Sequence, residues 1–132
     1  MELSRRASLL LPLSLLGCSK DGTAAGTAQA FIDRYYLERD HPRALELSAG
    51  AAAERVASEQ RLLFEGGPSS GPQPKVYSKL EKTVPRGEDT ELTYTLTIDA
   101  GGLSLRKRVL VLVKKLEGHY KVAFFSENDL PV

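Results

Sequence analysis

Residues 91–98 read ELTYTLTI, in which a large apolar or aromatic side chain occupies every second position. Side chains of a β-strand point alternately to the two faces of its sheet, so this period predicts a strand with one apolar and one polar face. Residues 76–84, 103–115 and 120–126 are also rich in strand-forming residues, and glycine-containing turns join the segments. The C-terminal half is therefore predicted to be an antiparallel meander of four strands.

The loop at residues 66–74, GGPSSGPQP, separates these strands from an N-terminal part with helical periodicity. Before the loop, apolar residues recur three and four positions apart, which predicts helices at residues 27–36, 42–47 and 51–64. Asp40 is the predicted N-cap of the second helix. The predicted fold class is α+β, with three N-terminal helices packed on one face of a curved four-stranded antiparallel sheet.

This order of elements resembles the nuclear-transport-factor-2-like (cystatin-like) fold, a cone-shaped scaffold shared with ketosteroid isomerase. The resemblance covers residues 27–127. It rests on the last strand, where residues 118–124 read GHYKVAF, and on the apolar face of the first helix. The matching residues of that helix are Ala28, Phe31, Ile32, Tyr35 and Tyr36. The resemblance implies a cone, and the candidate residues of a ligand pocket in it are Tyr35, Tyr36 and Tyr94.

Residues 109–113 (VLVLV) are apolar at five consecutive positions, and residues 123–125 (AFF) repeat this in the last strand. Because only one face of the sheet meets the helices, strands that are apolar on both sides predict that a second layer covers the other face. Members of the family commonly dimerise through this sheet, so a homodimer or an envelope protein partner is expected there. The alternative is cover by residues 128–132. The residues predicted to form the interface are Leu110, Leu112, Ala123, Phe125, Arg106 and Arg108.

The first 17 residues have the layout of a secretory signal. Arg5 and Arg6 form a basic start, residues 9–16 form a mainly apolar stretch, and Gly17 precedes Cys18, the single cysteine of the sequence. The apolar stretch is shorter than the ~20 residues that a membrane-spanning helix needs.

Residues 15–18 (LLGC) resemble the lipobox of bacterial lipoproteins, in which a signal peptidase cuts before the cysteine and the sulfur carries diacylglycerol. The resemblance implies that residues 1–17 are removed, that lipidated Cys18 and residues 19–26 form an anchor and tether, and that residues 27–132 form the domain. The protein is then exported and held at the cell membrane or outer membrane, facing the periplasm or exterior. The alternative is that Cys18 is a small buried core residue.

Composition and motifs exclude several functions. The 132 residues hold 18 Lys and Arg against 17 Asp and Glu, so no basic excess points to nucleic acid. One cysteine and two histidines leave no multi-ligand metal site, and no cofactor motif occurs. Isomerase-type proton transfer needs carboxyl groups in an apolar pocket, but the candidates Asp33 and Asp40 fall on a polar helix face and at a helix cap.

The predicted function is a non-catalytic binding or assembly module at the cell envelope, without metal or cofactor. The alternative is a protein with a pocket for a small apolar ligand and weak isomerase- or hydratase-type activity.

Overall fold

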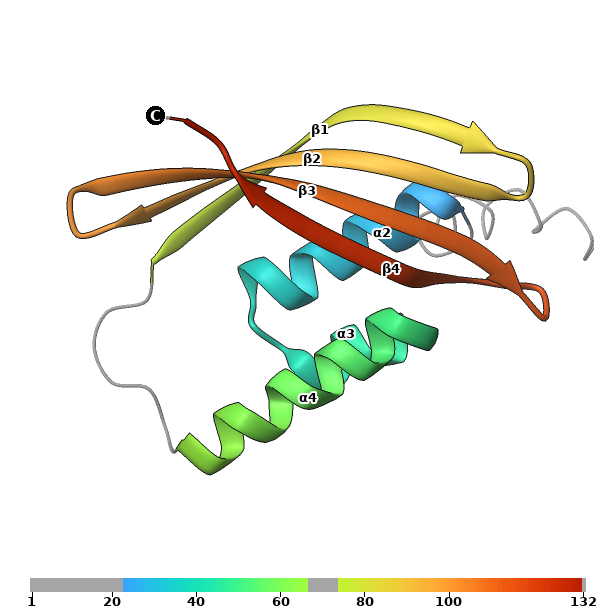
Figure 1. Ribbon diagram of the computed structural model, residues 1–132, viewed down its shortest axis with the longest axis horizontal. Coiled ribbons are helices and arrows are strands. Elements are labelled where there is room, and N and C mark those ends of the chain that lie inside the picture. The colour runs from blue at the N-terminus through green and yellow to red at the C-terminus, as the bar shows by residue number, and fades with distance from the viewer. Residues whose placement is uncertain (1–22, 67–73, 132) are drawn as a thin grey trace, which may run out of the picture.

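The computed structural model describes residues 23–66 and 74–131 (Figure 1). The predicted signal segment, Cys18 and the centre of the Gly/Pro loop lie outside these residues. The helical elements are α2 (Ala24–Ile32), η2 (Asp33–Leu37), α3 (His41–Glu46) and α4 (Gly50–Gly66). The strands are β1 (Lys75–Arg86), β2 (Asp89–Ala100), β3 (Leu103–Leu116) and β4 (His119–Asp129). The predicted α+β class, with helices before strands, is confirmed.

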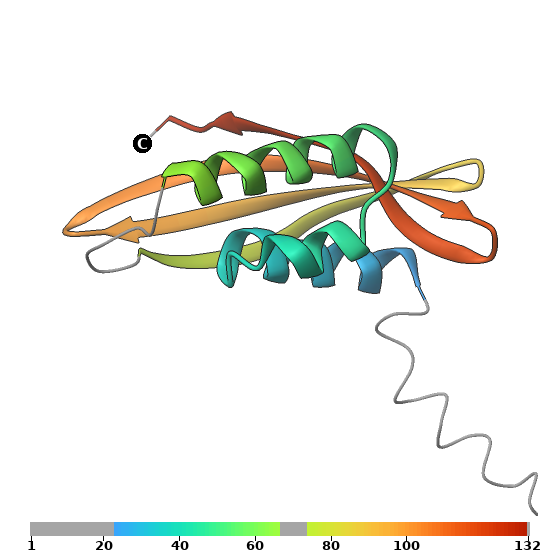
Figure 2. The same cartoon turned by 90° about the horizontal axis from the view of Figure 1, so that it is seen from below.

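The four strands form one antiparallel sheet in the order β1-β2-β3-β4, so each strand pairs with its neighbours in the sequence. Gly101 and Gly102 make the β2–β3 turn with φ of 56° and 89°, values that glycine adopts without a side-chain clash. The helices all lie on one face of the twisted sheet, the inner face (Figures 1 and 2). The opposite face is the outer face.

The alternation predicted for residues 91–98 is confirmed. Leu92, Tyr94 and Leu96 point to the inner face and are fully buried, whereas the threonines between them are partly exposed. Burying such an apolar side chain stabilises the fold by about 1.5–3 kcal/mol. The strands therefore supply one wall of the core, and the helices supply the other.

Helix α2 begins at Ala24, three residues before the predicted start. Thr23 caps it, because its hydroxyl accepts a hydrogen bond from the Gly26 amide at 2.8 Å. Residues 24–26, which the sequence placed in the tether, therefore form the first turn of the helix.

The helix changes character at its C-terminal end. Residues Asp33–Leu37 form a π-helical turn, η2, closed by the Glu38 amide donating to the Asp33 carbonyl at 2.8 Å. Such turns are rare and often occur at functional sites. Tyr35 of this turn is buried, and Tyr36 packs against the core.

The short link between α3 and α4 pairs with the edge strand β4. The Val122 amide donates to the Leu47 carbonyl, and the Ala49 amide donates to the Val122 carbonyl, both at 2.8 Å. These bonds occupy backbone groups that an edge strand otherwise leaves unpaired. Asp40 caps α3 as predicted, since its carboxylate accepts from the Arg43 amide at 3.2 Å.

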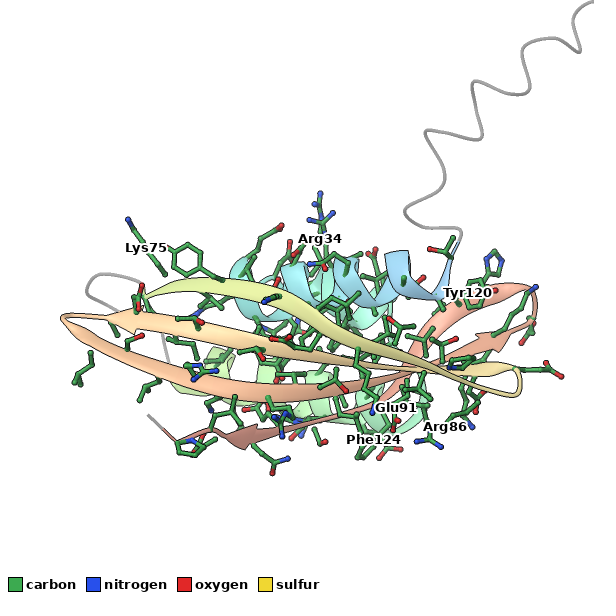
Figure 3. The ribbon with its side chains drawn as sticks, turned by 90° about the horizontal axis from the view of Figure 1, so that it is seen from above. Arg34, Lys75, Arg86, Glu91, Tyr120 and Phe124 are labelled. Carbon is green, nitrogen blue, oxygen red and sulfur yellow. The ribbon has the colours of Figure 1, made fainter. Side chains whose placement is uncertain are left out.

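Strand β4 contains a β-bulge, because the β3–β4 register shifts between Leu112 and Val113 and leaves Ala123 without a partner. The extra residue reverses the alternation of side chains beyond it. Phe125 is therefore 3% exposed on the inner face, and Phe124 is 44% exposed on the outer face. The prediction that Phe125 lies on the outer face, as part of an interface there, is wrong, and Phe124 lies on that face instead (Figure 3).

Every described helix and strand lies between Ala24 and Asp129. A chain that starts at Ser19 therefore contains the whole described core. Within residues 23–66 and 74–131, no helix combines the length and apolar character needed to cross a membrane.

Candidate functional site

A cleft of about 330 Å³ opens on the inner face, between η2, α4 and the strand ends near the β2–β3 turn. Its volume lies at the small end of the range of about 300–1,000 Å³ that is usual for ligand pockets. Aromatic, apolar, basic and acidic side chains line it: Tyr35, Tyr36, Arg39, His41, Arg55, Glu59, Leu63, Val76, Ile98, Lys107 and Glu127.

Packed aromatic rings form the floor of the cleft. Tyr35 stacks on Phe31 with ring centroids 5.4 Å apart and meets Phe125 edge to face at 5.0 Å. Tyr36 and His41 lie against the Tyr35 ring at 4.7 and 5.1 Å. Such pairs contribute about 0.5–1.5 kcal/mol each beyond burial, so the aromatic floor is held in place before a ligand arrives.

Two carboxylates from distant parts of the chain meet in the cleft, Glu59 of α4 and Glu127 of β4. Arg55 joins them, with Nε 3.2 Å from Glu59 Oε2 and Nη2 3.3 Å from Glu127 Oε2. The Tyr35 hydroxyl donates a hydrogen bond to Glu59, and the Tyr36 hydroxyl donates one to Glu127. Each carboxylate therefore has a cationic partner and a hydroxyl partner.

The two carboxyl groups have opposite pKa shifts. Burial raises the pKa of Glu59, and the charge of Glu127 raises it further, although Glu59 shares the Arg55 guanidinium. Burial alone would also raise the pKa of Glu127, but the Tyr36 hydroxyl, Lys107 and Arg55 together hold it below its ordinary value. Burial, with the hydrogen bond to Glu127, raises the pKa of Tyr36, so this phenol stays a neutral donor.

The basic side chains of the cleft differ in their partners. Lys107 Nζ lies 3.4 Å from Glu127 Oε1 and 3.8 Å from Asp129 Oδ1. Arg55 is shared by the two glutamates. Arg39 lies in the link between η2 and α3, where its side chain is exposed at the cleft.

Of the predicted pocket residues, Tyr35 and Tyr36 line the cleft and Tyr94 does not. Tyr94 is fully buried in the core, and its hydroxyl has no hydrogen-bond partner among the described residues. Burial, aided by the charge of Asp33, raises the pKa of Tyr94 to about 12. Asp33 accepts a hydrogen bond from Gln29 at 2.9 Å and does not line the cleft.

The predicted interface residues lie at several places. Leu110 and Leu112 are half-buried on the outer face, the same face as exposed Phe124, which pairs with Leu112. Arg106 and Arg108 are exposed on that face and line a groove of about 590 Å³ together with Lys82, Thr93, Thr95 and other residues. Ala123 is the bulge residue.

The C-terminal residues reach only one end of the outer face within the described chain. The Leu130 amide donates to the Arg106 carbonyl at 2.9 Å, and Leu130 lines the groove beside Arg106 and Arg108. Cover of Leu110 and Leu112 by a second protein stays a prediction.

Sequence interpretation did not assign Glu59 or Glu127 to a site. A signal for Glu59 was available, because it falls seven positions after Ala52 and four before Leu63, on the apolar stripe of its helix. Glu127 gave no such signal, because simple alternation along β4 places it on the outer face, and the bulge at Ala123 turns it inward.

Comparison with protein-family models, curated protein sequences and solved structures finds no match. The described residues contain no group of three or more His, Cys, Asp or Glu side chains arranged to hold a metal ion. The cleft geometry is therefore the main guide to function.

Proposed function

We propose that this protein is an exported, lipid-anchored binding module of the cell envelope, and that the cleft is its binding site for a small molecule. The observation that supports a binding site here is that η2, α4 and the ends of four strands converge on one cleft, whose walls are aromatic, apolar and charged. Small-molecule sites characteristically combine an apolar surface with a few fixed polar groups.

The polar groups of the cleft favour binding over catalysis. Glu59 and Glu127 are both held by Arg55 and by a tyrosine hydroxyl. A carboxylate with such partners is oriented, but it is less available as a base than an unpaired one. The arrangement supports a preformed site that a ligand enters without large rearrangement.

The anchor and the cone belong to the proposal as well. The charged start, short apolar stretch and LLGC sequence at residues 15–18 support lipidation at Cys18. The helices on one face of the sheet (Figure 1), with a cleft between them and the strand ends, support a nuclear-transport-factor-2-like cone. Metabolic labelling with an alkyne fatty acid tests the anchor: the wild type should incorporate label and Cys18→Ala should not. Equal labelling of both contradicts lipidation at this residue.

Native mass spectrometry tests the site. The chain from Ser19 is incubated with a small-molecule extract of its own cells, and adduct masses are recorded. Leu63 lines the cleft, whereas its neighbour Leu62 does not, and both are more than half exposed. Leu63→Ser should lose an adduct that the wild type and Leu62→Ser retain. An adduct retained equally by both variants contradicts the assignment of the cleft.

Proton-transfer chemistry is a second candidate, favoured by the raised pKa of Glu59. A glutamic acid whose pKa lies nearer neutrality is a better proton donor and acceptor than an ordinary one. Incubation of the retained ligand with protein in deuterated water tests it. Deuterium incorporated by the wild type, and not by Glu59→Gln that still binds, supports the enzyme. No incorporation by either protein supports a binding module.

Self-association through the outer face is a further part of the proposal, because Leu110, Leu112 and Phe124 form its apolar centre. Sedimentation equilibrium of the chain from Ser19 should give a dimer, and Phe124→Asp should give a monomer. A wild-type monomer contradicts this part and leaves the cleft unaffected.

A further inference from the structure

We infer that the ligand of the cleft is a small amphipathic anion, with its acidic group against Arg39 and its apolar body against Leu63, Val76 and Ile98. The inference rests on the proposed function, since it names the class of molecule that the same cleft would bind. Four features of the cleft support it: its charges, the backbone conformation of Arg39, its apolar wall and its volume.

Among the residues that the structure describes, the charged groups of the cleft leave one cation for a ligand. Arg55 is held by Glu59 and Glu127, and Lys107 lies within 4 Å of Glu127 and Asp129. No ion pair among the described residues involves Arg39, although its side chain lines the cleft. An entering anion therefore finds an accessible guanidinium that needs no existing pair to break.

A cationic ligand fits the same lining less well. Glu59 and Glu127 share the single positive charge of Arg55, and Lys107 is a second cationic partner of Glu127, so the two carboxylates are balanced by these two cations. The lining holds three basic and two acidic side chains, so its charges attract an anion more than a cation. The charges thus favour an anion.

The backbone at Arg39 is strained. Arg39 has φ of 57°, in the left-handed region that side-chain-bearing residues seldom adopt. Left-handed residues are common where a helix ends and also occur at ligand sites, and they persist where the surrounding structure holds them. Here the Asp40 amide, which donates to the Arg34 carbonyl at 2.7 Å, fixes the link that carries Arg39.

The apolar wall supplies the second half of the ligand site. Leu63 is 55% exposed at the cleft, and Val76 and Ile98 are half-buried in it. Contact with a ligand would remove this apolar surface from water. The volume of about 330 Å³ limits the ligand to a small molecule. Arg39 favours an acidic group at one end of it, and the apolar wall favours an apolar body.

Two fluorescent probes that differ by one acidic group test the inference. Anilinonaphthalene sulfonate is an apolar anion, and phenylnaphthylamine is the same framework without the sulfonate. Each is titrated into the chain from Ser19, and the dissociation constants of both are compared between variants. Arg39→Asn removes the charge while keeping a residue that tolerates positive φ, and Arg39→Lys keeps the charge. Arg61→Gln removes one positive charge from the exposed surface of α4, outside the cleft.

The sulfonate probe should bind the wild type more tightly than the neutral probe. Arg39→Asn should weaken the sulfonate probe about fivefold and leave the neutral probe unchanged. Arg39→Lys should retain most of the affinity, and Arg61→Gln should bind both probes like the wild type. Leu63→Ser should weaken both probes, which places them in the cleft.

Equal binding of the sulfonate probe by Arg39→Asn and the wild type overturns the inference, while the proposed function stands if Leu63→Ser still weakens both. An equal loss of sulfonate affinity in Arg61→Gln also overturns it, because the effect then reflects overall charge. Binding of neither probe, or binding insensitive to Leu63→Ser, contradicts the proposed site and this inference with it.

Discussion

The Tyr36 hydroxyl donates a hydrogen bond to the carboxylate of Glu127, a residue 91 positions further along the chain. The bond joins the π-helical turn η2 to the end of strand β4. Glu127 also pairs with Arg55 of α4 and Lys107 of β3. This carboxylate therefore connects four elements at the cleft, and its partners can be tested one at a time.

Removing the Tyr36 hydroxyl should destabilise the protein. In Tyr36→Phe, Glu127 loses one charge-assisted hydrogen bond but keeps Arg55 and Lys107, so the free energy of unfolding should fall by about 1–2 kcal/mol. Urea unfolding followed by circular dichroism measures it. Tyr77→Phe, at an exposed tyrosine, is the matched control and should stay within about 0.5 kcal/mol of the wild type. Equal values for both variants would show that the bond contributes nothing to stability.

Glu127→Gln should destabilise the protein in a pH-dependent way. At pH 7 the loss should be about 1–2 kcal/mol, because Arg55 and Lys107 lose a charged partner. The folded-state pKa of Glu127 lies below the unfolded one, so the folded state binds fewer protons in acid.

The advantage of the wild type over Glu127→Gln should therefore be complete above the unfolded-state pKa of about 4.3 and shrink as pH falls through the lower folded value. Urea unfolding at neutral and acidic pH measures the difference. Glu54→Gln, at an exposed position of α4, should show no such trend. A difference for Glu127→Gln that is constant with pH argues against the lowered pKa.

Tyr94→Phe should have the opposite sign from Tyr36→Phe. The Tyr94 hydroxyl is buried, and no described residue forms a hydrogen bond with it, so its burial has a desolvation cost that no described side chain or backbone group offsets. Its removal should raise the free energy of unfolding by about 1 kcal/mol. A clear loss of stability would mean that the hydroxyl has a bonded partner, such as a buried water.

The two neighbouring phenylalanines of β4 should differ sharply. Phe125→Ala opens a cavity in the aromatic core beneath the cleft and should cost about 3–5 kcal/mol. Phe124→Ala alters the outer face and should cost less than about 1 kcal/mol in the monomer. Unfolding of both variants at low protein concentration tests the bulge at Ala123. Equal losses, or a larger loss at Phe124, would contradict it.

The order of elements and the inner-face residues of β2 were predictable, because repeated alternation and helical spacing are properties of the sequence itself. The β-bulge in β4 was not predictable. A single unpaired residue at Ala123 reverses every later side chain of β4, and this moves both Phe125 and Glu127 to the inner face. Nothing in the run of residues 120–126 indicates where such a bulge falls, because apolar residues occupy both faces there.

The cleft was predictable only in part. Tyr35 and Tyr36 could be chosen because they share an apolar helix face and the resemblance to a cone-shaped fold implied a pocket there. The charged lining could not be predicted. Arg55 and Glu59 of α4 meet Glu127 of β4 only in the folded protein, and the sequence does not place these two elements relative to each other. A glutamate on the apolar stripe of α4 was the available clue.

Nuclear magnetic resonance of the protein with the bound sulfonate probe distinguishes binding in the cleft from binding on the outer face. Backbone amide shifts of the nitrogen-15-labelled chain from Ser19 are followed during the titration. We expect the largest changes around the cleft, at Tyr36, Arg39 and Ile98. Changes centred instead on Leu112 and Phe124 of the outer face would contradict binding in the cleft.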